Sequence, residues 1–129
     1  MAKNIHILIL EDRASDADLV EFELMEAGLA FTPKRAMNEK EFLRALEEFS
    51  PDLILSDYDL PQYTGALALA EAKKRFPEVP FILVTGALDK KPERIGEILA
   101  RGASDYVLKD RLDQLAPAVH SALGFGCGV

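Results

Sequence analysis

Short apolar runs alternate five times with helix-forming segments along this chain of 129 residues. The first run, residues 5–10, is continuously apolar, as is typical of strands that are buried on both faces of a parallel sheet. We expect these strands at residues 5–10, 31–37, 53–55, 81–84 and 106–108. Apolar residues recur at helical spacing after each run. We expect these helices at about residues 16–27, 39–49, 66–76, 92–101 and 115–123.

The order of the elements predicts the kind of sheet. Strands separated by helical crossovers are parallel, and right-handed crossovers place helices on both faces of the sheet. An open α/β sheet of this size fits the flavodoxin-like, doubly wound arrangement of five parallel strands in the order 2-1-3-4-5. Ligands of such sheets bind at the carboxyl ends of the strands, beside the first strand, where the order reverses.

Several helix boundaries can be predicted from capping residues and prolines. Ser15 precedes Asp18 by three residues, the spacing of a capping box, and Asn38 can cap the second helix. Pro92 suits the first turn of the fourth helix. Residues 61–65, which begin with proline and end with glycine, predict a turn before the third helix.

Length and composition bound the class of protein. We expect a single domain over residues 1–129, with its core at about 4–123 and a flexible tail at 124–129. The net charge of −7 argues against direct binding of nucleic acid. No apolar stretch is long enough to insert into a membrane. A single cysteine is consistent with a reducing compartment, so we expect a cytoplasmic location. The sequence leaves open whether the chain acts alone or is part of a longer protein.

Polar residues follow four of the five predicted strands. Glu11 and Asp12 end the first strand, Asp57 ends the third, Thr85 the fourth and Lys109 the fifth. Because the first and third strands are neighbours in the predicted order, we expect their carboxylates to meet at one edge of the sheet. Core packing does not require this grouping, so the sequence predicts a shared polar site.

The residue types at this edge favour phosphoryl transfer. Clustered carboxylates repel one another unless a cation is present, and hard oxygen ligands suit Mg²⁺. A lysine ammonium and a hydroxyl would add positive charge and a hydrogen bond for phosphoryl oxygens. A carboxylate can act as the nucleophile and form an aspartyl-phosphate. Asp57 is the central candidate for that role.

The chain resembles the response-regulator receiver domains of bacterial two-component signalling, of the chemotaxis-regulator type. The resemblance extends over residues 4–123 and rests on four motifs in this order: ILILED, LILSDYDLPQYTG, FILVTGA and GASDYVLK. It implies a phosphorelay signalling protein rather than an enzyme, with at most self-phosphorylation and self-dephosphorylation activity. The phosphoryl donor would be a sensor histidine kinase or a histidine phosphotransfer protein.

The resemblance also implies a phosphorylation and metal site. Asp57 would be phosphorylated in a reaction that requires Mg²⁺. Asp12 and Asp57 would bind the ion directly, and Glu11 would bind it through water. The backbone carbonyl of Asp59 would be a further ligand.

Three more residues take switch roles by the same resemblance. Lys109 would pair with the phosphoryl group, and Thr85 would move to form a hydrogen bond with it. Tyr106 matches the switch aromatic of the family, whose inward or outward rotamer reports the position of Thr85. The face near the fourth helix, fifth strand and fifth helix would present the change to a downstream protein, which the sequence does not identify.

The chain departs from the receiver pattern after Lys109. Receivers usually have a proline there, joined through a cis bond, whereas Asp110 follows here. A cis bond before a residue other than proline costs about 3 kcal/mol, which leaves the conformation of this bond open. Simpler interpretations also stay open: Lys109 as a surface ion pair, Thr85 as a helix cap and Tyr106 as a packing residue.

Two other function classes compete with the phosphorylated receiver. The first is a receiver-fold interaction module that works without phosphorylation. The second is a phosphatase of the haloacid-dehalogenase type, because Asp57-Tyr58-Asp59 has the Asp-x-Asp pattern of its nucleophile and acid. That family carries the motif after its first strand, whereas here it follows the third.

Overall fold

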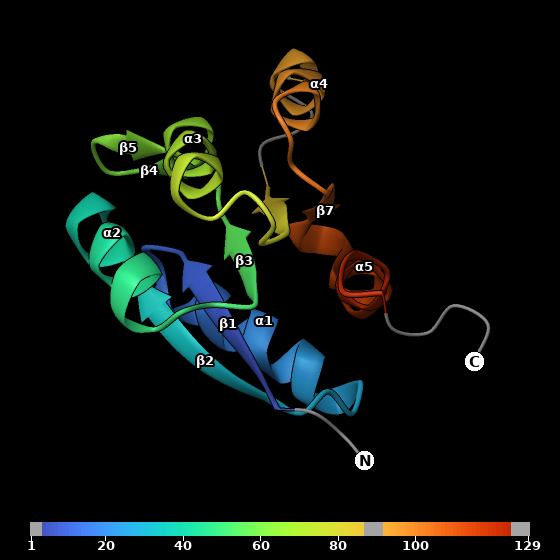
Figure 1. Cartoon of the computed structure of the whole chain (residues 1–129). Coiled ribbons are helices and arrows are strands. Elements are labelled where there is room, and N and C mark those ends of the chain that lie inside the picture. The colour runs from blue at the N-terminus through green and yellow to red at the C-terminus, as the bar shows by residue number, and fades with distance from the viewer. Residues whose placement is uncertain (1–3, 87–91, 125–129) are drawn as a thin grey trace.

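A parallel sheet covered by helices on both faces forms the protein in its computed structural model, which describes residues 4–86 and 92–124 (Figure 1). The strands of this sheet are β1 (Ile5–Leu10), β2 (Phe31–Ala36), β3 (Leu53–Ser56), β6 (Phe81–Thr85) and β7 (Asp105–Leu108). They lie in the order β2-β1-β3-β6-β7, and every neighbouring pair is parallel. Since β6 and β7 are the fourth and fifth predicted strands, the predicted order 2-1-3-4-5 is confirmed.

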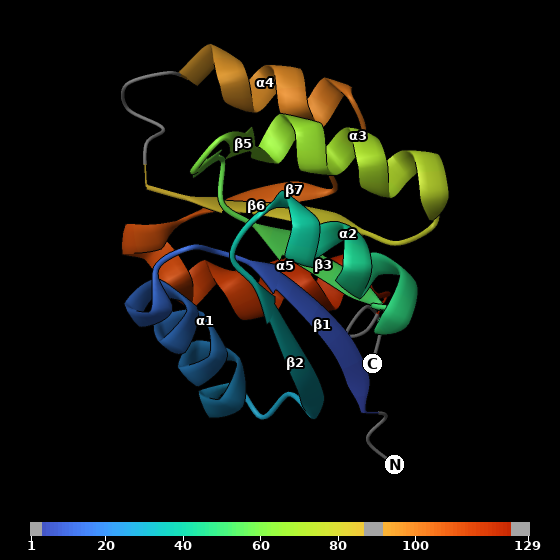
Figure 2. The same ribbon diagram turned by 90° about the vertical axis from the view of Figure 1, so that its left-hand side faces the viewer.

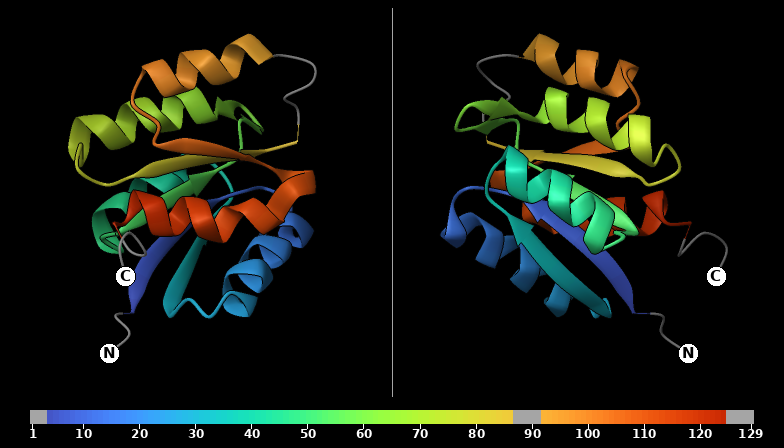
Figure 3. Two further views of the ribbon diagram at one scale, coloured as in Figure 1. Left: turned by 90° about the vertical axis from the view of Figure 1, so that its right-hand side faces the viewer. Right: turned by 60° about the vertical axis from the view of Figure 1, so that its left-hand side comes forward.

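The helices cover the sheet in two groups. They are α1 (Ala14–Glu26), α2 (Glu39–Glu48), α3 (Gly65–Arg75), α4 (Pro92–Ala100) and α5 (Leu115–Ala122), with the 3₁₀ helix η1 (Lys109–Gln114) directly before α5. Helices α1 and α5 pack against one face, and α2, α3 and α4 pack against the other (Figures 2 and 3). The prediction of helices on both faces is therefore confirmed.

The continuous apolar runs are explained by this double covering. In β1, Leu8 and Leu10 belong to the core beneath α2, α3 and α4, while Ile7 and Ile9 belong to the core beneath α1 and α5. All four side chains are at most 2 % exposed. Successive side chains of a strand point to opposite faces of the sheet. Because both faces are buried here, apolar residues do not alternate with polar ones along this part of the strand.

The strand register brings the predicted acids together. Leu10 of β1 pairs with Ser56 of β3, the last residue of each strand. The backbone N–H of Asp57 donates to the carbonyl of Leu10 at 3.0 Å, and the N–H of Glu11 donates to the carbonyl of Ala36 at 2.9 Å. Glu11 and Asp57 therefore leave the sheet side by side, at its carboxyl edge.

Two capping predictions have different outcomes. Asn38 caps α2, because its side-chain oxygen accepts a hydrogen bond from the N–H of Glu41 at 2.9 Å. The predicted capping box at Ser15 is wrong: α1 begins earlier, with Arg13 as its N-cap and no side-chain cap bond. The acid of that box, Asp18, instead forms an ion pair of 2.6 Å with Arg35 of β2.

The predicted turn at residues 61–65 is part of a small hairpin. Strand β4 (Asp59–Leu60) pairs antiparallel with β5 (Tyr63–Thr64). Thr64 then caps α3, since its hydroxyl accepts from the N–H of Leu67 at 3.2 Å. Residues 125–129 of the predicted tail lie outside the described residues. Within the described ranges, no helix has the length and hydropathy of a membrane-spanning segment.

Candidate functional site

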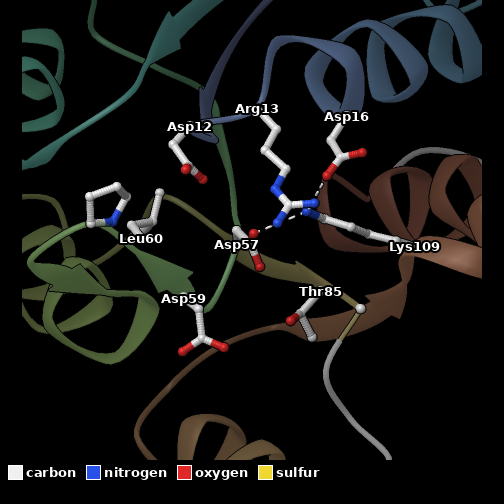
Figure 4. Close-up of a pocket in the computed structure, with 10 residues that line it drawn as sticks. Asp12, Arg13, Asp16, Asp57, Asp59, Leu60, Thr85 and Lys109 are labelled. Carbon is white, nitrogen blue, oxygen red and sulfur yellow. Dashed lines mark hydrogen bonds and ion pairs between the residues drawn. The ribbon is translucent and has the colours of Figure 1, made fainter.

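An open hollow of about 380 Å³ lies at the carboxyl edge of the sheet (Figure 4). Five predicted site residues line it: Asp12, Asp57, Asp59, Thr85 and Lys109. Strands β1, β3, β6 and β7 each end beside it, so the sheet topology itself assembles the site. This is the edge at which ligands bind in doubly wound sheets.

Lys109 is the centre of the charged contacts. Its ammonium lies 2.7 Å from Glu11 Oε1, 2.8 Å from Asp16 Oδ2 and 3.0 Å from Asp57 Oδ2. These carboxylates lie directly after β1, in the first turn of α1 and directly after β3, so one lysine joins segments that are far apart in the sequence. The ammonium is held where it would meet any group attached to Asp57.

Burial and charge act in opposite directions on these groups. Burial alone would lower the pKa of Lys109, but hydrogen bonds to Asp16, Glu11 and Asp57 together raise it above its ordinary value. The ammonium is therefore firmly charged. Burial raises the pKa of Glu11, and the charge of Asp57 raises it further, although Lys109 acts in the lowering direction. The clustered carboxylates therefore repel one another, and an added cation would reduce this repulsion.

Glu11, Asp12 and Asp57 form a cluster that fits a divalent metal. One carboxylate oxygen from each lies within 4.8 Å of the others. Glu11 is buried and the other two are partly buried. Hard oxygen donors with space for water at an open hollow are the set that Mg²⁺ prefers. The residues present therefore fit the metal that was predicted from the sequence.

The carboxylate of Asp57 is oriented at both oxygens. Oδ1 accepts a hydrogen bond of 2.7 Å from the backbone N–H of Tyr58, and Oδ2 contacts Lys109. The hydroxyl of Ser56 donates to the backbone carbonyl of Asp57 at 2.7 Å. With its side chain and backbone both held by these contacts, Asp57 presents its carboxylate at the hollow.

Asp59 turns its carboxylate toward α4. Its Oδ1 lies 3.7 Å from a guanidinium nitrogen of Arg94, whose Cζ also lies 5.0 Å from the ring centroid of Tyr58. The motif Asp57-Tyr58-Asp59 follows β3, the third strand of the chain. Its second acid is engaged by α4, which does not favour the nucleophile and acid pair of a haloacid-dehalogenase-type phosphatase.

The two predicted switch residues lie in different surroundings. Thr85 is 2 % exposed and lines the hollow with Asp57. Tyr106 is 40 % exposed on β7 and borders a separate hollow between β7 and α5. The structure therefore does not bring Tyr106 into the hollow of Asp57. The bond between Lys109 and Asp110 is trans, as are the other peptide bonds of the described residues.

Two charged residues of the hollow were not predicted from the sequence: Arg13 and Asp16. Both lie at the beginning of α1, directly after the acidic pair that ends β1. Asp16 follows Asp12 by one helical turn, and that spacing was the available signal. The spacing of Ser15 and Asp18 instead predicted a capping box in this region.

Comparisons with known proteins agree on one family. The model of the response regulator receiver domain matches residues 7–120. The two-component response regulator ORR8 of Oryza sativa subsp. indica is 35% identical over 105 residues, which cover 81% of this chain and 85% of that protein. The transcriptional regulatory protein CitT of Bacillus subtilis is 31% identical over 105 residues, which cover 81% of this chain and 46% of CitT.

Solved structures agree with the sequence relatives. The receiver domain of NtrX from Brucella abortus superposes with a TM-score of 0.82 at 28% identity, covering 93% of this chain and 99% of that one. The relatives come from rice as well as from bacteria, so they support two-component signalling without restricting the source to bacteria. The chain belongs to the response regulator receiver domain family.

Proposed function

We propose that the chain is a phosphoacceptor switch in which Asp57 receives a phosphoryl group from a phosphohistidine. The observation that carries the proposal is the 3.0 Å contact between Lys109 Nζ and Asp57 Oδ2, beside the cluster of Glu11 and Asp12. A nucleophilic carboxylate, a charged ammonium and oxygen ligands for a metal are the parts that phosphoryl transfer to an aspartate requires.

In the proposed reaction, a carboxylate oxygen of Asp57 attacks the phosphorus of the donor. The phosphorus–nitrogen bond breaks, and the imidazole nitrogen keeps the electron pair and takes a proton from solvent. Glu11, Asp12 and Asp57 would hold Mg²⁺, with the backbone carbonyl of Asp59 as a further ligand. The bound metal supplies positive charge against the phosphoryl oxygens. Lys109 adds its ammonium on the same side as Asp57.

The proposed switch follows from the added charge. Thr85 moves to form a hydrogen bond with the phosphoryl group, which shifts the equilibrium between two conformations. Tyr106 and the face of α4, β7 and α5 present the change to a downstream protein. We treat residues 1–129 as one receiver domain whose phosphoryl donor is a cytoplasmic histidine kinase or phosphotransfer protein.

Intact mass spectrometry with acetyl phosphate tests this function. The wild-type protein should gain one phosphoryl group in the presence of Mg²⁺ and none without it. Asp57→Ala should gain none under either condition. Asp59→Ala is the matched control, because it removes a neighbouring carboxylate that points toward Arg94, and it should still form the adduct.

The negative outcomes point to the other function classes. A folded wild-type protein that binds Mg²⁺ but forms no adduct would indicate an interaction module that works without phosphorylation. Sustained hydrolysis of a small phosphate ester would support the phosphatase instead. Either result would contradict the phosphoacceptor switch.

A further inference from the structure

Arg13 differs from the other cation of the hollow in its contacts. Lys109 is shared by Glu11, Asp16 and Asp57. The guanidinium of Arg13 forms no ion pair with any carboxylate in the described part of the chain, although it lines the same hollow. Figure 4 shows its side chain extending into the hollow between Asp12 and Asp16. Arg13 therefore has hydrogen-bond donors to offer an incoming anion.

The backbone at Arg13 is fixed while its side chain is exposed. Its N–H donates to Glu11 Oε2 at 3.1 Å, and the residue is the N-cap of α1. Its side chain forms no cap bond that a ligand would have to break. The arrangement places a guanidinium at the hollow with no ion-pair partner among residues 4–86 and 92–124.

The charge of the hollow creates a need for such a cation. Four aspartates line it: Asp12, Asp16, Asp57 and Asp59. A phosphoryl donor is itself an anion, so it must approach against these carboxylates. Arg94 is not available to receive it, because Arg94 contacts Asp59 and the ring of Tyr58.

We propose that Arg13 is a second phosphoryl-binding residue, which contacts the phosphoryl oxygens of the donor as it enters the site. This inference rests on the phosphoacceptor function proposed above. A guanidinium presents paired N–H donors that match two oxygens of a phosphoryl group, and its charge does not depend on pH in the physiological range. Lys109 would hold the group from the side of Asp57, and Arg13 from the side of α1.

Phosphorylation kinetics with two donors test the role of Arg13. The rate of adduct formation is measured by intact mass with dianionic acetyl phosphate and with monoanionic phosphoramidate, at saturating Mg²⁺. Arg13→Ala should lower the apparent second-order rate constant with acetyl phosphate by about fivefold, mainly through a higher half-saturating donor concentration. The loss with phosphoramidate should be smaller, because that donor carries less charge.

Two further variants separate binding from structure. Arg13→Lys keeps the charge and should recover part of the rate. Arg101→Ala also removes one positive charge, but directly after α4 and outside the hollow. It should be phosphorylated at the wild-type rate. Added salt should reduce the difference in rate between the wild type and Arg13→Ala, since only the wild type attracts the donor through this charge.

Three outcomes would overturn the proposal in distinguishable ways. Wild-type rates in Arg13→Ala with both donors would show that Arg13 does not bind the phosphoryl group. An equal loss with both donors and no change in salt dependence would indicate a structural effect instead. If the wild type itself forms no adduct, the proposed phosphoacceptor function fails, and the role of Arg13 fails with it.

Discussion

A Cβ atom at Gly65 would lie 2.7 Å from the backbone carbonyl oxygen of Asp57. The same atom would lie 3.1 Å from Cα of Tyr58, and the N–H of Gly65 already donates to the carbonyl of Tyr58 at 2.7 Å. The beginning of α3 is thus pressed against the loop that carries the candidate phosphoacceptor. Only a residue without a side chain allows this approach.

Gly65→Ala should therefore disturb both the fold and the reaction. Because the obstructing atoms belong to the backbone, we expect a loss of about 2 kcal/mol in the free energy of unfolding. Displacement of Asp57 should also slow phosphorylation by acetyl phosphate. Urea denaturation and intact mass measure the two effects. Gly96→Ala is the control: its Cβ would have no atom within 4 Å, so it should not lower the free energy of unfolding and should leave phosphorylation near the wild type.

Lys109→Gln tests whether the ammonium compensates the carboxylates of the site. Without it, Glu11, Asp16 and Asp57 would lose the ammonium that contacts all three carboxylates. We expect a loss of about 2 kcal/mol in stability, less than for a fully buried pair because the lysine side chain is 21% exposed. Added Mg²⁺ should recover part of this loss, because it supplies the missing charge. The measurement is urea denaturation with and without Mg²⁺.

Lys74→Gln is the matched control for that variant. Lys74 is exposed on α3 and lies outside the hollow. Its replacement should change stability by less than about 0.5 kcal/mol, with or without Mg²⁺. A loss in Lys109→Gln that is the same in both buffers would contradict the compensation described here.

The strand order and most of the site could be predicted from the sequence for a physical reason. Continuous apolar runs separated by helices leave few arrangements for the chain, and parallel strands bring their carboxyl ends to one edge. The polar residues at the ends of four strands could therefore be assigned to the site without knowledge of side-chain positions. Glu11, Asp57 and Lys109 meet in the structure for this reason.

The contacts that could not be predicted from the sequence depend on side-chain conformation. Asp16 could have capped a helix, exposed its charge or turned inward, and only the structure shows its contact with Lys109. Helix α1 begins at Ala14, directly after Arg13, and no side chain caps it. The capping residue that the sequence offered therefore did not mark its start. Contacts such as that between Asp59 and Arg94 join segments whose distance along the sequence gives no signal of proximity.

Asp12 and Asp59 should differ in their effect on Mg²⁺ binding. Asp12 belongs to the acidic cluster and, unlike Glu11 and Asp57, is not paired with Lys109, so its charge is available to a metal. We expect Asp12→Asn to weaken Mg²⁺ binding by at least about tenfold, as measured by titration calorimetry. Asp59→Asn keeps the backbone carbonyl and should change the affinity by less than about threefold. Equal losses in the two variants would contradict this assignment of ligands.

Tyr63 should make stability depend on pH in the alkaline range. Its side chain is buried, and its hydroxyl has no hydrogen-bond partner among the described residues. Burial raises its pKa to about 12, and the charges of Glu39 and Glu71 act in the same direction. A tyrosine in the unfolded chain ionises near pH 10, so the unfolded state loses its proton first. The stability of the wild type should be fully present below about pH 10 and decrease as the pH rises toward about 12.

Tyr63→Phe removes this proton and the buried hydroxyl together. We expect the variant to be at least as stable as the wild type at neutral pH, because an unsatisfied buried hydroxyl costs about 1 kcal/mol or more. Its advantage should be constant below about pH 10 and grow between about pH 10 and about pH 12, measured as the difference in free energy of unfolding in urea. Tyr106→Phe, at an exposed position, should show no such growth. A constant difference between Tyr63→Phe and the wild type would mean that Tyr63 ionises equally in both states, which its burial argues against.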